Sequence, residues 1–276
     1  MSRQVIRPGA DAFTERTPRV AAARRLTKRD GRTEAGRFLA EGAQAVREAL
    51  AWGRVRELFV TATAAARNPE LVEAAGKAGI PVSEITEKAA AGISETVTPQ
   101  GLVAVCDLVD RPLSEVLADR PKLVAVLVGV ADPGNAGTVT RVADAAGAGA
   151  VLFAGDTVDP HNGKCVRASV GSIFHLPVAR GRNVDAVLAA CREAGLRLVA
   201  ADGYADTDLD TAIDTGALAG PTAWLFGSEA HGLPAEATAA ADCAVRVPLY
   251  GAAESLNLAT AAAVCLYASA RAQRAG

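Results

Sequence analysis

Short apolar runs alternate with amphipathic stretches along the first hundred residues. Residues 43–53 carry apolar side chains at helical spacing and end at Gly53, which indicates a helix with a glycine stop. Strands that alternate with helices are typical of a layered α/β domain, and about 105 residues is an ordinary domain size. We therefore predict an N-terminal α/β domain over residues 1–108. Its expected strands are 37–42, 55–60, 80–85 and 101–108, and its other expected helices are a basic one over 19–35 with a break at Gly31, one over 68–79, and a short one before the last strand.

A second α/β series follows a segment that contains two prolines and mixed charge. We interpret that segment, residues 109–121, as a linker to a domain over 122–276. The run at 123–130 is apolar at every position, which is typical of a strand buried on both faces of a parallel sheet. The further strands are expected at 150–155, 196–202, 222–227 and 243–249, and the helices at 135–146, 183–194 and 257–274.

Composition excludes several classes of protein. Half of the residues are apolar and 22% are charged, as in soluble globular domains. The longest apolar runs are too short to span a bilayer, and the start of the chain lacks the apolar core of a signal peptide, so we expect a cytoplasmic protein without membrane contact. The odd number of cysteines, five, favours reduced thiols. The three histidines show no metal-ligand spacing, so no metal site is expected.

Charge is unevenly distributed along the chain. Residues 1–37 hold ten Lys and Arg against four Asp and Glu, a net charge of +6, whereas the whole chain carries −2. A basic leading segment on an acidic body suits a polyanionic partner, because neutralised phosphates supply most non-specific affinity for nucleic acids. A solvated tail without a partner is the alternative, and charge alone does not decide between the two.

Three segments of the C-terminal half place polar residues where a strand ends. In open α/β sheets, ligands bind at the carboxyl ends of strands. The first segment, 130–147, contains Asn135 and Arg141; the second, 225–234, contains Glu229 among glycines; the third, 247–264, contains Ser255 and Asn257 before a helix. Each segment taken alone is better explained by a helix N-cap or a glycine-rich turn than by an active site.

Together the segments carry a pattern that resembles the SpoU family of RNA ribose methyltransferases, also called the TrmH family, within the SPOUT superfamily. The N-terminal part resembles the small substrate-binding domain of that family, a fold shared with RNA-binding ribosomal proteins. The C-terminal stretches that carry the resemblance are NAGTVTR (135–141), VDPHNGKCVRASVGSIFHLPV (158–178), LFGSEAHGL (225–233) and VPLYGAAESLNLATA (247–261), and the N-terminal ones are RFLAEGAQAVREAL (37–50) and SETVTPQGLVAV (94–105).

The resemblance implies a fold, a cofactor and an assembly. Members of the family have a C-terminal domain with a trefoil knot, which would lie around residues 222–261 here, and they form homodimers through this domain with an active site built from both subunits. S-adenosyl-L-methionine binds in the knotted loops with its adenine held by backbone groups. The expected cofactor contacts are Phe226, Gly227, Val247, Leu249 and Leu256.

The resemblance also implies the reaction, in which a ribose 2′-oxygen of RNA displaces the methyl group of the cofactor. Arg141 has been viewed in the family as the base, but arginine keeps its proton in proteins, so our hypothesis is that it binds the phosphate beside the target ribose. Asn135 would orient Arg141 or the ribose, and Glu229 would hold Arg141 by an ion pair, while the remaining two residues shape the catalytic loop. The expected catalytic residues are Asn135, Arg141, Glu229, Ser255 and Asn257.

The resemblance makes 23S rRNA the expected substrate, because the tRNA enzymes of the family typically have a different N-terminal extension. A tRNA ribose methyltransferase and a non-catalytic RNA-binding or ribosome-assembly protein are the alternatives. Some relatives in antibiotic producers confer self-resistance, and that role is open here. A nucleotide-dependent doubly wound enzyme is disfavoured because the chain lacks GxGxxG and P-loop spacing. The expected RNA contacts are Arg24, Arg25, Lys28, Arg29, Arg32 and Arg37.

Overall fold

The computed structural model describes residues 11–275, and the chain within this range forms two compact units. Unit 1 comprises the chain up to Val109 together with His161–Phe174, and unit 2 comprises Asp110–Pro160 and the chain from His175 onward. Arg3 and Arg7 of the basic leading segment lie outside the described residues. Among the described helices, none combines the length and apolar character needed to cross a bilayer.

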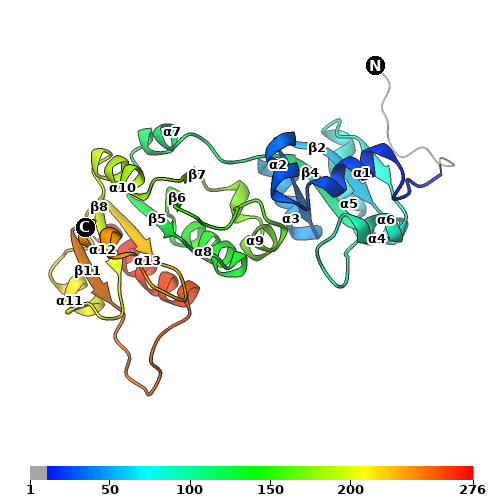
Figure 1. Ribbon diagram of the computed structural model, residues 1–276. Helices are drawn as coiled ribbons and strands as arrows, with labels where there is room; N and C mark the ends of the chain where they lie inside the picture. Colours follow the sequence, from blue (N-terminus) through cyan, green and yellow to red (C-terminus); the bar gives the residue numbers. More distant parts are fainter. Residues whose placement is uncertain (1–10, 276) are drawn as a thin grey trace. The chain divides into compact units, whose positions relative to one another are not determined.

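Unit 1 is a four-stranded mixed sheet with helices on both faces (Figure 1). Strand β4 (Leu102–Asp107) lies antiparallel between β1 (Arg37–Glu41) and β2 (Val55–Val60), and β3 (Val82–Glu84) pairs in parallel with β2. The α/β architecture predicted for this half of the chain is confirmed. Its helices are α1 (Pro18–Arg25), α2 (Arg29–Ala35), α3 (Ala43–Trp52), α4 (Ala62–Arg67), α5 (Pro69–Lys77), α6 (Glu87–Gly92) and α9 (Gly163–Ser169).

Alternation along β1 divides the core of unit 1 into two layers. Leu39 belongs to a buried cluster with Val20 of α1, Phe59 of β2 and Ala89 of α6. The neighbouring Phe38 points the other way, as alternate strand residues do, and stacks on Phe174 at 5.7 Å between ring centroids. Residues 161–174, which the sequence analysis placed in the C-terminal domain, therefore pack against the N-terminal sheet.

The basic N-terminal stretch forms two helices whose break differs from the prediction. The chain leaves the helix at residues 26–28, so the expected break at Gly31 is wrong. Gly31 lies inside α2, where an added Cβ would lie 2.0 Å from the carbonyl oxygen of Arg25. The glycine thus lets α2 pass close to the end of α1 instead of interrupting the helix.

Unit 2 is built on a seven-stranded sheet of order β7-β6-β5-β10-β8-β11-β9, in which every recorded pairing is parallel. The parallel sheet predicted from the apolar runs is thereby confirmed. Its strands are β5 (Leu123–Val128), β6 (Ala150–Ala154), β7 (Val178–Gly181), β8 (Arg197–Ala201), β9 (Thr207–Asp208), β10 (Thr222–Phe226) and β11 (Cys243–Arg246).

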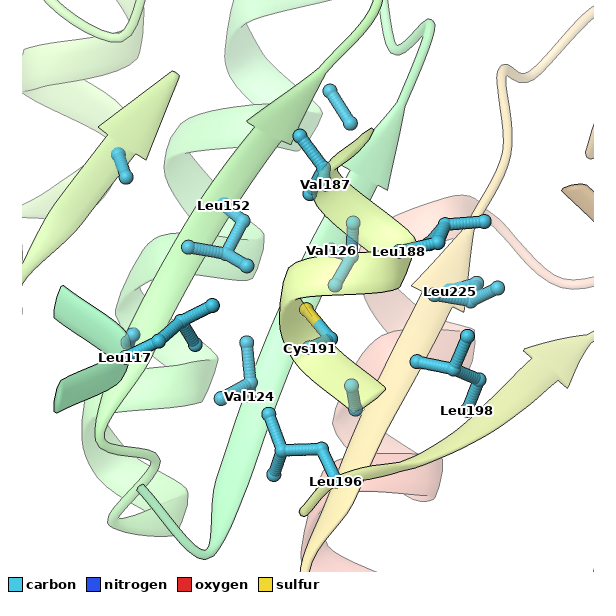
Figure 2. Close-up of a cluster of buried hydrophobic side chains, with 14 of the residues drawn as sticks. Leu117, Val124, Val126, Leu152, Val187, Leu188, Cys191, Leu196, Leu198 and Leu225 are labelled. Atoms are coloured by element: carbon cyan, nitrogen blue, oxygen red, sulfur yellow. The ribbon is translucent and has the colours of Figure 1, made fainter. Parts of the chain in front are cut away.

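Helices cover the two faces of this sheet, so its central strands are buried on both sides. Figure 2 shows one layer, in which Leu188 of α10 lies beside Val126 and Leu225 of the sheet and Leu117 of α7 lies nearer Val124. On the opposite face, the indole Nε1 of Trp224 in β10 donates a 2.8 Å hydrogen bond to Ser269 Oγ of α13. The helices are α7 (Leu113–Ala118), α8 (Pro133–Ala146), α10 (Val184–Glu193), α11 (Leu209–Asp214), α12 (Ala235–Ala240) and α13 (Leu258–Ala275).

The segment interpreted as a linker is only partly extended chain. Within residues 109–121, α7 forms a helix whose Val116 and Leu117 are buried in the core of unit 2. The predicted domain boundaries at residues 108 and 122 stay a prediction. The two compact units do not follow them fully, because residues 161–174 lie after both boundaries but belong to unit 1.

Candidate functional site

A cavity of about 1040 Å³ opens at the carboxyl ends of three neighbouring strands of unit 2. Its walls are the segments that follow β8, β10 and β11, together with the first turn of α13. The segment between β11 and α13, drawn in orange in Figure 1, projects from the unit. Carboxyl ends of parallel strands are where open α/β sheets bind ligands, and the volume is at the upper end of those found for small-molecule sites.

The segment after β10 is a tight hairpin that glycine makes possible. Ser228 and Gly232 exchange two backbone hydrogen bonds, of 3.0 and 2.9 Å, and Gly232 has a φ of +68°. A Cβ on Gly227 would lie 2.1 Å from the carbonyl carbon of Gly232 and 2.2 Å from the nitrogen of Leu233. Only glycine at position 227 lets the returning strand pass this close, so backbone atoms form this wall of the cavity.

Three side chains from the three predicted segments meet in a hydrogen-bonded cluster. Asn135 Nδ2 donates to Glu229 Oε1 at 2.7 Å, and Asn257 Nδ2 donates to Asn135 Oδ1 at 3.0 Å. A carboxylate only accepts, so the amide nitrogen of Asn135 faces Glu229 and its oxygen is left for Asn257. Glu229 and Asn257 line the cavity. We call these three residues the Asn135 cluster.

Local folding rules explain how Asn135 and Asn257 reach the cluster. Helix α8 begins at Pro133, and the side chain of its N-cap, Asp132, accepts from the backbone nitrogen of Asn135 at 2.8 Å. The alternative that Asn135 is itself the N-cap is therefore wrong, and the Asn135 side chain is available for the cluster. Asn257 precedes α13, and its Oδ1 accepts from the backbone nitrogen of Ala259 at 2.9 Å while its Nδ2 reaches Asn135.

Arg141 stands apart from the cluster. It is exposed on α8, and within residues 11–275 its guanidinium has no recorded ion pair or hydrogen bond. Glu229 bonds to Asn135, so the expected ion pair between Glu229 and Arg141 is absent from the described part of the chain and that expectation is wrong for the single chain. Arg141 presents an uncompensated positive charge.

The positions expected to contact the cofactor lie around the same cavity. Ser255 is exposed on the segment after β11 and also lines it. Contact of these residues with a cofactor stays a prediction. The five positions are Phe226, Gly227, Val247, Leu249 and Leu256, and all of them line the cavity.

The cavity wall includes ionisable residues that the sequence analysis missed. Asp202 and Glu254 add two carboxylates to that of Glu229. Arg246 is also a wall residue, but its Nη1 already donates to the carbonyl oxygens of Ala205 at 2.6 Å and of Asp206 at 2.7 Å. The excess of carboxylates favours a ligand that carries positive charge. Asp202 follows β8 directly, so the same strand-end argument applied to 196–202 could have found it.

Unit 1 holds the arginines and the lysine expected to contact RNA, and these side chains differ in exposure. Arg32 is 3% exposed and its Nη1 donates to the carbonyl oxygens of Leu26 and Thr27 at 3.0 and 3.1 Å, so it cannot reach RNA and this expectation is wrong. Arg25 pairs with Glu34 at 2.5 Å. The other expected contacts, Arg24, Lys28, Arg29 and Arg37, are exposed.

Comparison with known families decides the classification. Residues 122–267 match the SpoU rRNA Methylase family, and residues 17–104 match the MRM3-like substrate binding domain. The chain belongs to the SpoU rRNA methylase family. The Asn135 cluster lies within the matched methylase region, and unit 1 contains the matched substrate-binding region.

Two curated SpoU relatives cover most of this chain and of their own length. The 23S rRNA (guanosine(2553)-2'-O)-methyltransferase RlmP of Bacillus subtilis (strain 168) is 34% identical over 88% of this chain and 92% of the relative. The 23S rRNA (uridine(2479)-2'-O)-methyltransferase of Streptomyces viridochromogenes is 33% identical over 95% of this chain and 96% of the relative.

Solved SpoU structures share the fold across nearly the whole chain. The AdoMet-bound rRNA methyltransferase from Sinorhizobium meliloti matches with a TM-score of 0.81 and 32% identity, over 95% of this chain and 97% of that one. The SpoU methyltransferase AviRb from Streptomyces viridochromogenes, in complex with the cofactor AdoMet, matches with a TM-score of 0.80 and 30% identity, over 94% and 100%. These likenesses confirm the predicted α/β fold, with a SpoU methyltransferase domain that has a parallel sheet and an N-terminal substrate-binding domain.

Proposed function

We propose that the protein transfers the methyl group of S-adenosyl-L-methionine to a ribose 2′-oxygen of RNA, with 23S rRNA as the substrate. The observation that carries the proposal is the Asn135 cluster, which joins three segments of the SpoU pattern beside one cavity. The names of the relatives support it, since RlmP and the Streptomyces viridochromogenes enzyme are both named as 23S rRNA 2'-O-methyltransferases.

The residues around the cavity fit the cofactor. The hairpin that begins at Gly227 presents backbone groups at close range, and Phe226, Val247 and Leu256 offer apolar surface for an adenine ring. The carboxylates of Asp202 and Glu254 suit the positive charges of the amino and sulfonium groups. When bound, S-adenosyl-L-methionine supplies a methyl group on cationic sulfur, which a nucleophile can displace directly.

The chain's own residues then bind and orient the RNA. Arg141 would anchor the phosphate beside the target ribose, and its freedom from any ion pair within residues 11–275 leaves the charge available. Asn135 would fix the ribose or the Arg141 side chain, held in one orientation by its two neighbours. Holding the hydroxyl in line with the methyl group supplies much of the rate enhancement in a bimolecular reaction.

The assembly is part of the proposal. We infer a homodimer through unit 2, whose helix α13 packs against α8 and leaves Val264 39% and Tyr267 52% exposed. A second subunit would cover these side chains. The trefoil knot around residues 222–261 and the cytoplasmic location belong to the same proposal. Among residues 11–275, no three His, Cys, Asp or Glu side chains group as a metal site, and a metal-independent reaction stays a prediction.

The direct test is methyl transfer from isotopically labelled S-adenosyl-L-methionine to 23S rRNA, followed by mapping of 2′-O-methyl positions. A new ribose methylation at one site is the expected result. Methylation of a base contradicts the proposed mechanism, and methylation of tRNA alone favours the tRNA alternative. RNA binding without any transfer favours the non-catalytic alternative.

Arg141→Lys tests the phosphate anchor. Lysine keeps the charge but cannot offer the planar bidentate contact of a guanidinium, so both RNA affinity and turnover should fall. RNA affinity is measured by filter binding, and turnover under saturating RNA. A variant that binds RNA normally yet is inactive at every pH contradicts the anchor and returns Arg141 to a role in proton transfer.

A role in antibiotic resistance is the second candidate. The similarity to the Streptomyces viridochromogenes enzyme over 95% of this chain, and to the AviRb structure over 94%, supports it. Expression in a susceptible strain tests the role: resistance to a ribosome-directed drug should accompany the new methylation and disappear in an Asn135→Ala variant. Methylation without any change in drug susceptibility supports a housekeeping role.

A further inference from the structure

One end of the sheet in unit 1 gathers arginines around a single carboxylate. Arg37 opens β1 and is the cross-strand partner of Asp107, which ends β4. Arg56, near the start of β2, binds the same carboxylate through Nε at 2.8 Å and Nη2 at 2.6 Å. Arg54 accepts the backbone N–H of Asp107 on its carbonyl oxygen at 3.0 Å, so its side chain also starts at this end of the sheet.

Positive charge exceeds negative charge at this cluster. The hydrogen bond from Arg56 is the main cause that lowers the pKa of Asp107, and the nearby charges of Arg37 and Arg54 lower it further. Asp107 therefore pairs directly with Arg37 and Arg56, which are about half exposed, and Arg54 adds a third positive charge nearby. Exposed ion pairs contribute little to stability, so folding alone does not account for three arginines here.

A β-bulge brings Arg56 into the cluster. The pairing of β2 with β4 shifts register between Val55 and Glu57, so Arg56 is the extra residue of the strand. Bulges redirect a side chain and are common at sheet edges and beside functional sites. Glu57, the next residue, hydrogen-bonds Ser83 and pairs with Arg19, so it makes its own ion pair instead of neutralising this cluster.

An exposed tryptophan accompanies the arginines. Trp52 ends α3 with 68% of its surface exposed, and Gly53 leads from it to Arg54. A Cβ on Gly53 would lie 3.0 Å from Cδ1 of Phe174 and 2.8 Å from the carbonyl oxygen of Ala49, so the turn is held tightly against its neighbours. The indole is thereby presented to solvent from a fixed turn.

We propose that Arg37, Trp52, Arg54 and Arg56, here called the Trp52 patch, bind a single-stranded segment of RNA. Guanidinium groups contact phosphates without regard to sequence, and an exposed aromatic ring stacks on an unpaired base. Duplex RNA is disfavoured as the ligand because its bases are already stacked and paired. The inference rests on the proposed function only in taking RNA as the substrate. It adds an RNA contact outside the basic helices α1 and α2.

The test uses the full-length protein and a short fluorescein-labelled single-stranded RNA oligonucleotide, with binding followed by anisotropy across a salt series. Trp52→Ala should weaken binding about tenfold, since one base loses the aromatic ring on which it stacks, and Trp52→Phe should restore most of the affinity. The double variant Arg37→Gln, Arg54→Gln should flatten the salt dependence by about one unit of slope for each arginine. Arg47→Gln is the matched control, because Arg47 is an arginine of unit 1 with similar exposure that pairs with Glu70.

Tryptophan fluorescence provides a second readout. Trp224 is fully buried, so quenching by RNA should come from Trp52 and should vanish in Trp52→Phe. The patch is refuted if Trp52→Ala binds like the unaltered protein, if the arginine variant behaves like Arg47→Gln, or if the unaltered protein does not bind the oligonucleotide. Methyl transfer to 23S rRNA is measured on the same preparations. Its absence in the unaltered protein contradicts the proposed function, whereas the Trp52 patch is judged by the oligonucleotide-binding result alone.

Discussion

The Asn135 cluster of unit 2 and the Trp52 patch of unit 1 are both polar, but they differ in how their side chains are held. The cluster consists of two amides and one carboxylate joined by hydrogen bonds of 2.7 and 3.0 Å. The patch consists of long, half-exposed arginines around one carboxylate and an exposed indole. The cluster depends on the exact relative position of its atoms, whereas the patch depends on net charge and on one flat apolar surface.

This difference predicts two kinds of failure. A change that moves the atoms of the unit 2 site should reduce cofactor binding or turnover at any ionic strength, because short hydrogen bonds are sensitive to displacement. A change in the unit 1 patch should alter affinity in a salt-dependent way and leave the chemical step intact. Variants in the two regions should therefore form two groups when turnover is plotted against the salt dependence of RNA affinity.

Gly227→Ala is expected to have the largest effect. The added methyl would overlap Gly232 and Leu233, so the hairpin must move by an ångström or more and the cavity wall moves with it. Methyl transfer should fall about a hundredfold, the loss typical of such a displacement, and affinity for S-adenosyl-L-methionine, measured by calorimetry, should fall as well. Gly203→Ala is the control, since Gly203 lines the same cavity with no atom within 4 Å of an added Cβ. Equal affinities of the two variants would show that the hairpin does not form the cofactor site.

Asn135→Ala should affect turnover more than cofactor binding. Losing a hydrogen bond to a charged partner costs about 2 kcal/mol, which corresponds to about a thirtyfold lower kcat. RNA affinity at the Trp52 patch should not change, and a parallel loss of oligonucleotide binding contradicts the independence of the two regions.

Asn135→Asp adds a pH dependence to the same site. Two carboxylates, at 135 and 229, would then face each other across the position of a 2.7 Å hydrogen bond, so the pKa of one of them should rise. As the pH falls through that raised pKa, the shared proton restores the hydrogen bond. Activity relative to the unaltered enzyme should therefore increase toward acid, and a ratio that is flat with pH contradicts the pairing of Asn135 with Glu229.

The sequence predicted most strands and the longer helices of both units, but it did not predict the short helices α4, α7, α9, α11 and α12, nor the strand order. The apolar runs identified β5, β8, β10 and β11, whereas the placement of β10 between β5 and β8 depends on contacts between segments about a hundred residues apart. Hydrophobic periodicity reports which face is buried and carries no information about which strands are neighbours.

Individual site residues show where local interpretation fails. Taken alone, Asn135 fitted an N-cap better than a site residue, and only the structure shows that Asp132 takes the N-cap role. Arg32 belonged to a basic run, yet the turn between α1 and α2 leaves carbonyl groups that need a buried donor, and Arg32 supplies it. Of the Trp52 patch, the sequence analysis named only Arg37, because β1 and β2 are brought to the same carboxylate only by their pairing with β4.

Ser269→Ala separates stability from chemistry within unit 2. The change leaves the buried indole nitrogen of Trp224 without its 2.8 Å partner, and an unsatisfied buried donor costs about 1–3 kcal/mol. Urea unfolding should show this loss, while the salt slope of RNA binding stays unchanged. In a Trp224→Phe background, which removes the donor, Ser269→Ala should cost much less, and an equal cost in both backgrounds contradicts the hydrogen bond as its source.

Asp107→Asn should have the smallest effects of these variants. It should raise RNA affinity and lower stability. Removing the carboxylate raises the net charge of the Trp52 patch by one, so affinity for the single-stranded oligonucleotide should rise, by about threefold at low salt. The pKa of Asp107 is lower in the folded protein than in the unfolded chain, chiefly because of the hydrogen bond from Arg56. The ionised carboxylate therefore stabilises the fold at pH values above its unfolded pKa, and this contribution is lost as the pH falls through the folded pKa. Asp107→Asn should thus be less stable than the unaltered protein at neutral pH, and the difference should disappear in acid. Tighter RNA binding by a less stable variant would show that the arginines are free to bind phosphate once Asp107 is neutral, whereas weaker binding would mean that Asp107 is needed to hold them in place.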